Sequence, residues 1–410
     1  MTIRHAGRVA ALLLIVPLWM APAGAEVPKS GNNVVDAAVA LIDKNLYSPA
    51  ALPAFHDAAT ALIDDAKGAR IATSAGIDAL IASLHVSHSG RYTPDQVDYY
   101  DLSDVFRFNI RDLARKLYPP RGEVVYEGIG IASKVIDGHR FVTDVFDGMP
   151  AIKARIKAGD EILSADGKPF EEIGSFNHKT GQTVALEVRH TADAAPVTIP
   201  VSVEKTSPLA TYMEAVRESA RVIDQNGRKI GYVHLWTGAG DLTGVLNEVL
   251  ATKLKDVDGM VVDMRSRWGG GPADGAETFV GGSADMTITE NDGKTQYVNT
   301  RFHKPVVAII DEGTRSSMEI MAYGLKKNGI ALVGAPTAGD VLAARAFALP
   351  DDSLLELPVA DVMVDGQRLE GSPVTPTVPV AFDVRYANGA DPQMDAALVE
   401  LGKKLAAAVN

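Results

Sequence analysis

Buried strands and helices alternate along the second half of the chain, and this alternation constrains the fold more than any other feature. Helical patterns occupy residues 242–254 and 317–327. Short apolar runs that predict strands lie before, between and after them, at residues 229–236, 260–264, 305–310 and 330–333. Strands joined through helices lie parallel in one sheet, so the pattern predicts βαβ units and a parallel or mixed sheet.

The first half of the chain divides at a Pro-Pro-Arg-Gly break over residues 119–122. Before the break, apolar residues recur at helical spacing, as in Ile77, Leu80 and Leu84, whereas after it short β-rich runs dominate. A linker helix is predicted over residues 212–223, and Asp391 is the expected N-cap of a last helix. We therefore expect a multidomain α+β protein: a helical domain over 26–118, a β-rich domain over 123–204, an α/β core over 205–390 and a C-terminal helix over 391–410.

Charge and cysteine content exclude several classes of protein. The 410 residues include 40 basic and 52 acidic side chains, a net charge of −12, which argues against a nucleic-acid partner. The chain has no cysteine, so disulfide scaffolds, cysteine-ligated zinc, thiolate nucleophiles and iron–sulfur clusters are excluded.

Residues 1–25 have the features of a secretory signal peptide. Arg4 and Arg8 precede an apolar run of twelve residues over 9–20, and small residues follow at 23–25. A membrane-spanning helix needs about 20 apolar residues, so we expect cleavage near Glu26 and no membrane anchor afterwards. This predicts a periplasmic or secreted protein; the alternative is a retained N-terminal anchor.

The β-rich region carries a series of glycine turns in a distinctive order. Gly128-Ile129-Gly130-Ile131 is followed by Gly-Met-Pro-Ala at 148–151, by Ala-Gly-Asp-Glu-Ile-Leu at 158–163 and by Asp-Gly at 166–167. The series resembles a PDZ domain of the bacterial protease type. In such a domain a glycine-flanked turn captures a peptide carboxylate through backbone N–H groups, and the next strand adds the peptide to its edge. An unrelated small barrel is the alternative.

Ser316 lies where a strand passes into a helix, at the carboxyl edge of the predicted sheet. Sites in α/β folds gather at that edge, and the N–H of Ser317 opens the helix, where a negative oxygen is stabilised. This makes Ser316 a candidate nucleophile. The alternative is structural, because Ser316 and Glu319 fit the S-x-x-E pattern of a capping box.

Three glycines follow the strand that ends near Met264. Gly269 and Gly270 let backbone N–H groups approach a ligand closely, so they could form the other half of an oxyanion hole with Ser317. A phosphate cradle is disfavoured because no Lys-Ser/Thr follows, and a tight turn is the remaining alternative.

Two further segments carry side chains that could assist Ser316. Ser87 and His88 stand at the predicted end of a helix, and Glu370 stands in a turn-rich segment. By itself each has a structural explanation. His85 and His88, three apart on one helical face, could pair on a metal, but no third ligand stands at a recognised spacing.

Together these segments resemble the C-terminal processing (tail-specific) serine peptidase family, which also includes the tricorn core protease. The resemblance runs from about residue 77 to residue 380 and is carried by residues 263–270, 311–320 and 369–376 with the PDZ series before them. It implies a helical domain, a PDZ domain and an α/β catalytic core of crotonase-like (ββα) fold. It also implies polypeptide substrates, no cofactor or metal, and a possible homo-oligomer.

The family has two catalytic designs. In its Ser/Lys branch a lysine follows the nucleophile helix, but here Asp340 stands at that position, and a carboxylate cannot serve as the neutral amine base. In the tricorn-like branch a Ser-His pair and a later glutamate serve, which Ser87, His88 and Glu370 match. The resemblance then implies acyl transfer, with Ser316 as nucleophile, His88 as base and Glu370 as its orienting group, with Ser87 hydrogen-bonded between them or not.

Four residues depart from the family pattern around the site: Arg267, Trp268, Arg315 and Met318. They leave open the substrate preference and whether turnover is intact. Two other functions therefore compete with the peptidase. One is a catalytically silent, exported scaffold that binds peptides or another ligand, and the other is a crotonase-type acyl-CoA enzyme, which export from the cell disfavours.

Overall fold

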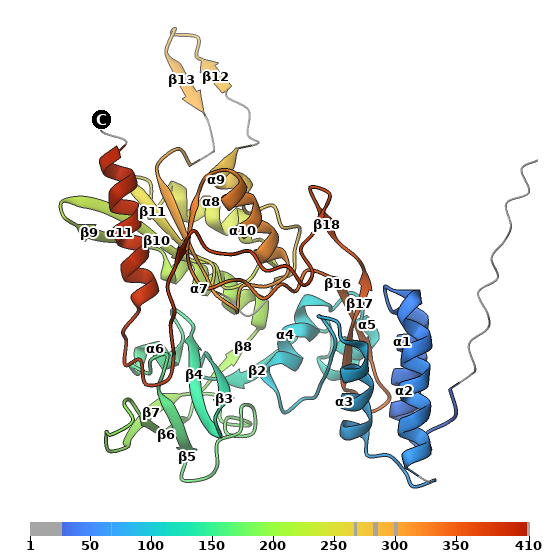
Figure 1. Ribbon diagram of the computed structural model, residues 1–410. Helices are drawn as coiled ribbons and strands as arrows, with labels where there is room; N and C mark the ends of the chain where they lie inside the picture. The colour runs from blue at the N-terminus through green and yellow to red at the C-terminus, as the bar shows by residue number, and fades with distance from the viewer. Residues whose placement is uncertain (1–26, 67, 266–268, 282–285, 299–301, 408–410) are drawn as a thin grey trace, which may run out of the picture.

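The computed structural model describes residues 27–66, 68–265, 269–281, 286–298 and 302–407 (Figure 1). Its central element is a six-stranded sheet in the order β20-β15-β14-β11-β10-β9. The strands are β9 (Arg221–Gln225), β10 (Arg228–His234), β11 (Gly259–Asp263), β14 (Val306–Ile310), β15 (Ala331–Gly334) and β20 (Val378–Pro379). All neighbours pair in parallel except β9, which pairs antiparallel with β10, so the predicted mixed sheet is confirmed.

Helices cover both faces of this sheet. On one face lies α11 (Pro392–Ala407), and on the other lie α7 (Pro208–Ser219), α8 (Leu242–Ala251) and α10 (Ser317–Lys327), with the short α9 (Glu277–Val280) beside them (Figure 1). Alternate residues of a strand serve the two cores, as Val261 packs under α11 and Val262 under the other helices. Every residue of β11, β14 and β15 is buried, which explains their continuous apolar sequence.

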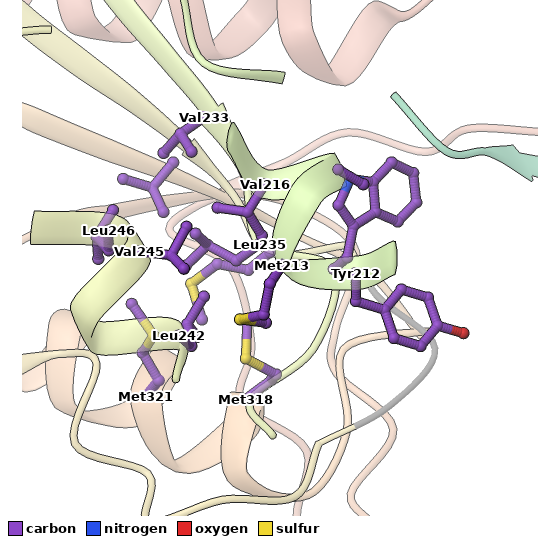
Figure 2. Packing of buried hydrophobic residues seen from close by; sticks show 14 of the residues in the cluster. Tyr212, Met213, Val216, Val233, Leu235, Leu242, Val245, Leu246, Met318 and Met321 are labelled. Atoms are coloured by element: carbon purple, nitrogen blue, oxygen red, sulfur yellow. The ribbon is translucent and has the colours of Figure 1, made fainter. Parts of the chain in front are cut away.

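The core between the sheet and helices α7, α8 and α10 is rich in methionine. Met213 of α7 and Met318 and Met321 of α10 meet beside Leu242 and Leu246 of α8 (Figure 2). Flexible thioether side chains fill irregular space between helices. Met318 is therefore a core residue and lies outside the pocket described below.

The predicted linker helix is wrong at its C-terminal end. Helix α7 ends at Ser219, and residues 221–223 belong to strand β9. Asn226 and Gly227 both have positive φ, 51° and 76°, and they turn β9 back onto β10. Asn-Gly between two apolar runs is a strong hairpin signal, and it explains why the helix cannot continue through this segment.

Residues 126–206 form a separate β-rich unit. Its antiparallel sheet has the order β3-β4-β5-β6-β7, from strands β3 (Ile131–Ile136), β4 (His139–Val145), β5 (Glu161–Ala165), β6 (Thr183–Arg189) and β7 (Val197–Ser202), with the short helix α6 (Pro150–Lys153). Strands β2 (Tyr126–Gly128) and β8 (Glu204–Thr206) pair antiparallel and bring the two ends of the unit together. Strand β3 is an edge strand of the five-stranded sheet.

The segment before this unit is mainly helical, and it packs on a distant part of the chain. It contains α1 (Asn33–Asn45), the 3₁₀ turn η1 (Pro49–Ala51), α2 (Leu52–Asp65), α3 (Thr73–Leu84), β1 (Gly90–Tyr92), α4 (Val97–Val105) and α5 (Arg111–Leu117). Helices α1 to α3 bury their apolar faces against Leu355 and Leu357 of strand β17 (Leu354–Ala360). β1 pairs with the same strand, whose other neighbour is β16 (Ala343–Ala348).

Two hairpins complete the chain: β12 (Met286–Thr289) with β13 (Thr295–Val298), and β18 (Met363–Val364) with β19 (Gln367–Arg368). The first projects away from the body of the molecule (Figure 1). None of the helices in the described ranges is long and apolar enough to cross a membrane.

Helix α11 is fixed at its start by charged and polar contacts. The expected N-cap is confirmed, since the Asp391 carboxylate accepts the N–H of Met394 at 2.9 Å. Arg265, just beyond β11, donates to Asp391 at 2.8 Å and to Gln393 at 3.2 Å. The same guanidinium donates to buried Asp263 at 2.9 Å. Burial would raise the pKa of Asp263, but the charge of Arg265 outweighs it and holds that pKa well below its usual range.

Burial on α11 can be tested with a matched pair of substitutions. Leu401→Ala removes a side chain that is fully buried under the sheet, and should lower the free energy of unfolding by about 2–5 kcal/mol. Val399→Ala changes a side chain of the same helix that is 58% exposed, and should change it by less than about 0.5 kcal/mol. Denaturant unfolding followed by circular dichroism measures both, and equal losses would contradict the packing of α11 on this sheet.

Candidate active site

Three loops meet at the carboxyl edge of the six-stranded sheet. They follow β11, β14 and β15, which are parallel neighbours, so their C-terminal ends lie at one edge. The loop after β11 contains Gly269 and Gly270, the loop after β14 ends in Ser316, and the loop after β15 runs through Thr337 to Asp340. Sequence segments that are far apart therefore converge at this edge.

Ser316 occupies a sharp turn between β14 and α10. Its backbone has φ 58° and ψ −125°, a conformation that non-glycine residues rarely adopt. In the nucleophile turn of other hydrolases, a strained strand-to-helix turn of this kind exposes the serine hydroxyl. The residue is also the N-cap of α10, with the capping box to Glu319 present, so the structural explanation and the nucleophile hypothesis are compatible.

Glu319 does more than cap the helix. Its fully buried carboxylate accepts the N–H groups of Gly339 and Asp340, both at 2.7 Å, and a hydrogen bond from the hydroxyl of Thr337. It also accepts the N–H of Ser316 at 3.3 Å. Burial raises the pKa of Glu319. The carboxylate thus ties the loop after β15 to the turn that carries Ser316.

Gly269 lies in direct contact with Ser316. A Cβ atom added to Gly269 would stand 2.5 Å from Ser316 Cβ and 2.7 Å from the backbone nitrogen of Ser317, so only glycine fits. The carbonyl of neighbouring Gly270 accepts a hydrogen bond from the Ser317 hydroxyl. The structure therefore brings Gly269, Gly270 and Ser317 to one side of Ser316, as expected of an oxyanion site.

His88 reaches this edge from the N-terminal segment. The pairing of β1 with β17, in register Gly90 with Glu356, holds the residues just before Gly90 against the core. The predicted helical face shared by His85 and His88 is wrong, because α3 ends at Leu84 and both histidines have left-handed backbones, with φ 49° and 52°. Among the described residues no group of three or more histidine, aspartate or glutamate side chains could hold a metal ion.

Glu370, Ser87 and His88 form one hydrogen-bonded series. The Ser87 hydroxyl donates to Glu370 Oε2 at 2.9 Å and lies 2.9 Å from His88 Nδ1. Because the one hydroxyl proton of Ser87 points to Glu370, the proton of the neutral imidazole is on Nδ1, and Nε2 keeps its lone pair. Glu370 also accepts the N–H of Ser87 at 3.3 Å and that of Val341 at 2.7 Å. Glu370 is therefore not the solvated carboxylate of the alternative explanation.

Burial and a nearby charge keep His88 neutral. The side chain is 8% exposed, and burial together with the positive charge of Arg315 lowers the pKa of His88 to about 3. Arg315 forms a loose ion pair with Asp340 at 3.6 Å. At neutral pH the imidazole is thus an unprotonated base.

Ser316 and His88 line the same pocket, a cavity of about 410 Å³. They are not hydrogen-bonded to each other in this structure. In hydrolases such a hydrogen bond often forms only when substrate binds. No lysine is among the described residues that line the cavity. Its apolar wall comes from helix α4 and from the loop after β15, with Leu102, Val105, Phe106, Val341 and Leu342.

The structure adds residues that sequence reasoning missed. Glu356 of β17 lines the pocket, almost fully buried, with the hydroxyl of Tyr92 donating to it at 3.2 Å. Burial raises the pKa of Glu356. No local sequence signal indicates this residue, because β17 follows the other site segments and reaches the pocket only through tertiary packing. Arg267 and Trp268 lie outside the described residues.

The turn that the sequence predicts to bind peptide lies between two strands. Gly128, Ile129, Gly130 and Ile131 connect β2 to the edge strand β3, and Gly130 has φ 79°. Ile129 and Ile131 are buried in the core of the β-rich unit.

Comparisons with known proteins agree with this geometry. Residues 229–380 match the model of peptidase family S41, and residues 128–203 match that of the PDZ domain. Residues 229–380 therefore resemble an S41 peptidase domain, and residues 128–203 resemble a PDZ domain. Ser316, Glu370 and the glycine loop lie inside the S41 region, whereas Ser87 and His88 precede both matched regions.

The chain is similar to several carboxy-terminal processing proteases. It is 26% identical over 275 residues to the carboxy-terminal processing protease CtpB of Bacillus subtilis (strain 168), covering 62% of this chain and 55% of that protein. It is 30% identical over 230 residues to the carboxyl-terminal-processing protease of Picosynechococcus sp. (strain ATCC 27264 / PCC 7002 / PR-6), covering 52% and 53%. The chain thus spans about half the length of the curated relatives that it matches.

A solved structure supports the fold. The photosystem II D1 C-terminal processing protease is similar over 91% of this chain and 97% of its own, with a TM-score of 0.51 and 18% identity. This chain therefore shares the mixed helix-and-sheet fold of that protease, and residues 128–203 add the match to a PDZ domain.

The contact between Gly269 and Ser316 yields a test. Gly269→Ala places a methyl group within 2.5 Å of Ser316 Cβ, and should slow the reaction of Ser316 with a fluorophosphonate by about 100-fold or more, because the serine turn must shift. Gly402→Ala on α11, where an added Cβ meets nothing within 4 Å, is the matched control and should react like the parent chain. Equal rates in the two variants would show that the glycine loop does not shape the site.

Proposed function

We propose that this chain is a serine peptidase that hydrolyses peptide bonds through an acyl-enzyme intermediate. The observation that carries the proposal is the series Glu370–Ser87–His88, which leaves an unprotonated imidazole nitrogen in the same pocket as a strained Ser316. The match of residues 229–380 to peptidase family S41 supports the same reaction. We infer that the chain uses the Ser/His/Glu design of the tricorn-like branch.

In the first half of the reaction Ser316 Oγ attacks the carbonyl carbon of the scissile bond. His88 Nε2 takes the hydroxyl proton, and the negative charge moves onto the carbonyl oxygen, where N–H groups of Gly269 or Gly270 and of Ser317 would receive it. The C–N bond then breaks, the leaving amine takes the proton from Nε2, and the acyl group stays on Ser316. Each oxyanion donor contributes about 3 kcal/mol in other hydrolases.

The second half repeats these steps with water. Nε2 removes a proton from the water as its oxygen attacks the ester carbon, and Ser316 leaves with that proton as the carboxylic acid product is released. In both halves of the reaction Glu370 orients the imidazole of His88 through the hydroxyl of Ser87. Glu370 stabilises the imidazolium through this hydroxyl, and the backbone donors of Ser87 and Val341 keep Glu370 in place.

Several further features belong to the proposal. The PDZ domain, assigned to residues 123–204, would engage polypeptide substrates through the Gly128–Ile131 turn, since an edge strand follows it. We infer a helical domain over 26–118, a catalytic core of crotonase-like fold over 205–390 and a C-terminal helix over 391–410. The signal-like residues 1–25 support a periplasmic or secreted location. Homo-oligomers are compatible with the family resemblance.

A fluorophosphonate probe tests the nucleophile directly. The purified chain should be labelled at Ser316, as mapped by mass spectrometry, and His88→Ala should slow labelling by about 100-fold or more because the base is lost. Glu370→Gln should slow it less, since Nε2 remains.

Ser89→Ala is the control for the labelling of Ser316. Ser89→Ala, one residue beyond His88, changes a hydroxyl that donates to the Val86 carbonyl at 2.9 Å, and this variant should label normally. A folded parent chain that does not label would favour the catalytically silent peptide-binding scaffold.

The low pKa of His88 gives a pH signature. Activity needs the neutral imidazole, so the labelling rate should stay level as pH falls through 6.5, where an ordinary histidine would already be protonated. Arg315→Gln removes a positive charge that lowers this pKa, so the acid limb should move to higher pH. Arg228→Gln, at the exposed start of β10, should leave the limb unchanged.

The lowered pKa of His88 also limits the pH range in which the folded chain can be studied. The unfolded chain binds a proton at His88 near pH 6.5 and the folded chain only near pH 3, so stability falls as pH decreases between these values. Circular dichroism at each pH identifies the range in which rates refer to folded protein. An acid limb at pH 6.5 in both the parent and Arg315→Gln would refute the assignment of His88 as a buried base.

A further inference from the structure

The edge strand of the PDZ domain has a groove beside it. One side is the start of β3, with Ile131, Ala132 and Ser133, and the other is the turn segment that contains Phe170 and Glu172. A peptide that adds to the edge of β3 after the Gly128–Ile131 turn would lie in this groove.

In this structure a residue from outside the PDZ domain closes part of the groove. Val97, the first residue of helix α4, lines the groove together with these two sides and is only 7% exposed. It packs with Tyr126 and Ile173 of the PDZ region in a small buried cluster. The space that remains is about 10 Å³, at the lower limit for a single water molecule.

A larger cavity lies next to the groove and shares Phe170 and Glu172 with it. This cavity measures about 630 Å³ and lies between Pro94, Asp95 and Gln96 before α4 and the PDZ residues 171–174. Arg140 lines it as well. A peptide can therefore approach the groove from the side of Phe170 and Glu172.

A PDZ carboxylate holds the start of α4 in place. Glu172 Oε2 accepts the N–H of Val97 at 3.3 Å, while Gln96 supplies no side-chain cap to the helix. An acidic group at a helix N-terminus stabilises the helix, but the contribution of one such contact is small. Glu172 is in turn held by Arg140 at 2.9 Å.

Helix α4 links the groove to the active-site pocket. Its far end supplies Leu102, Val105 and Phe106 to the pocket wall, and at about 1.5 Å per residue Val105 lies about 12 Å along the helix from Val97. The far half is fixed to α7, because Asp101 accepts the hydroxyl of Tyr212 at 2.8 Å and Asp104 accepts the N–H of Leu209 at 3.0 Å. Movement at the groove would thus concentrate in the first turn.

We propose that Val97 is a built-in occupant of the PDZ peptide groove. Its competitor is an extended polypeptide with a free C-terminal carboxylate and an aliphatic last residue, whose side chain takes the place of the valine. This inference rests on the proposed function, in which the PDZ domain engages substrate chains. Capture of a C-terminus then occurs at one end of the helix whose other end lines the pocket.

The absence of cysteine makes the displacement measurable. In the full-length Ser316→Ala chain, which cannot cleave, Val97→Cys introduces a single thiol. A saturating peptide of about ten residues that ends in valine with a free carboxylate should raise the rate of reaction of this thiol with a thiol reagent at least tenfold. The same peptide with an amidated end, or one ending in aspartate, should leave the rate unchanged.

Two matched thiols calibrate the rates. Val399→Cys, at an exposed position of α11, should react fast with or without peptide, and Val261→Cys, in the fully buried centre of β11, should stay slow. A peptide that binds by fluorescence anisotropy without exposing the thiol of Val97→Cys overturns the proposal, and so does a peptide that does not bind.

A second variant guards against a folding defect at position 97. Val97→Ala in the Ser316→Ala chain removes two buried carbon groups of the competitor, so the valine-ended peptide should bind roughly tenfold tighter. Unchanged or weaker binding by a variant with parental circular dichroism overturns the proposal.

Failure of this inference differs from failure of the peptidase assignment. Labelling of Ser316 in the parent chain, without peptide-dependent exposure of the thiol in Val97→Cys, rejects only the occupant. Exposure of that thiol without labelling of Ser316 rejects the peptidase and leaves a peptide-binding scaffold with this groove.

Discussion

The parallel pairing of β11, β14 and β15 is the constraint on which the site depends. Each of these strands is buried on both faces, between α11 and the helices of the other layer, so none can slip without exposing apolar side chains. Their carboxyl ends therefore deliver the glycine loop, Ser316 and the Thr337–Asp340 loop to one place. The contact between Gly269 and Ser316, which no larger residue permits, follows from that register.

Two carboxylates then join segments that the strands cannot connect. Glu319 binds the loop after β15 to the serine turn, and Glu370 binds Ser87 across 283 positions of sequence. Neither is a solvated surface charge, because each accepts several hydrogen bonds from backbone N–H groups or hydroxyls. The remaining partner, His88, is brought in by strand β1 on β17 and is kept neutral by burial and by Arg315. The site is thus assembled by polar contacts on a frame that apolar packing supplies.

Much of the frame could be predicted from the sequence. The buried strands, the mixed sheet, helix α10 and the cap at Asp391 follow from local periodicity and end signals, and the resemblance to a peptidase family follows from motif order. The errors are local as well: the predicted linker helix runs into β9 because apolar spacing outweighs the Asn226-Gly227 turn signal there. The shared helical face of His85 and His88 is wrong because α3 ends one residue before His85, which spacing alone does not reveal.

By itself, then, the sequence determined which segments form strands, helices and glycine turns, since these depend on neighbours a few residues away. The sequence also predicted which residue types form the site: a serine at the end of a strand, a Ser-His pair and a glutamate. Tertiary structure decided how these groups are arranged, because the protonated nitrogen of His88, the buried state of Glu319 and the presence of Glu356 depend on atoms far away in the sequence. It also decided that Val97 packs against the PDZ region and lines its groove, since an isolated valine at the start of a helix carries no sign of the surface against which it packs.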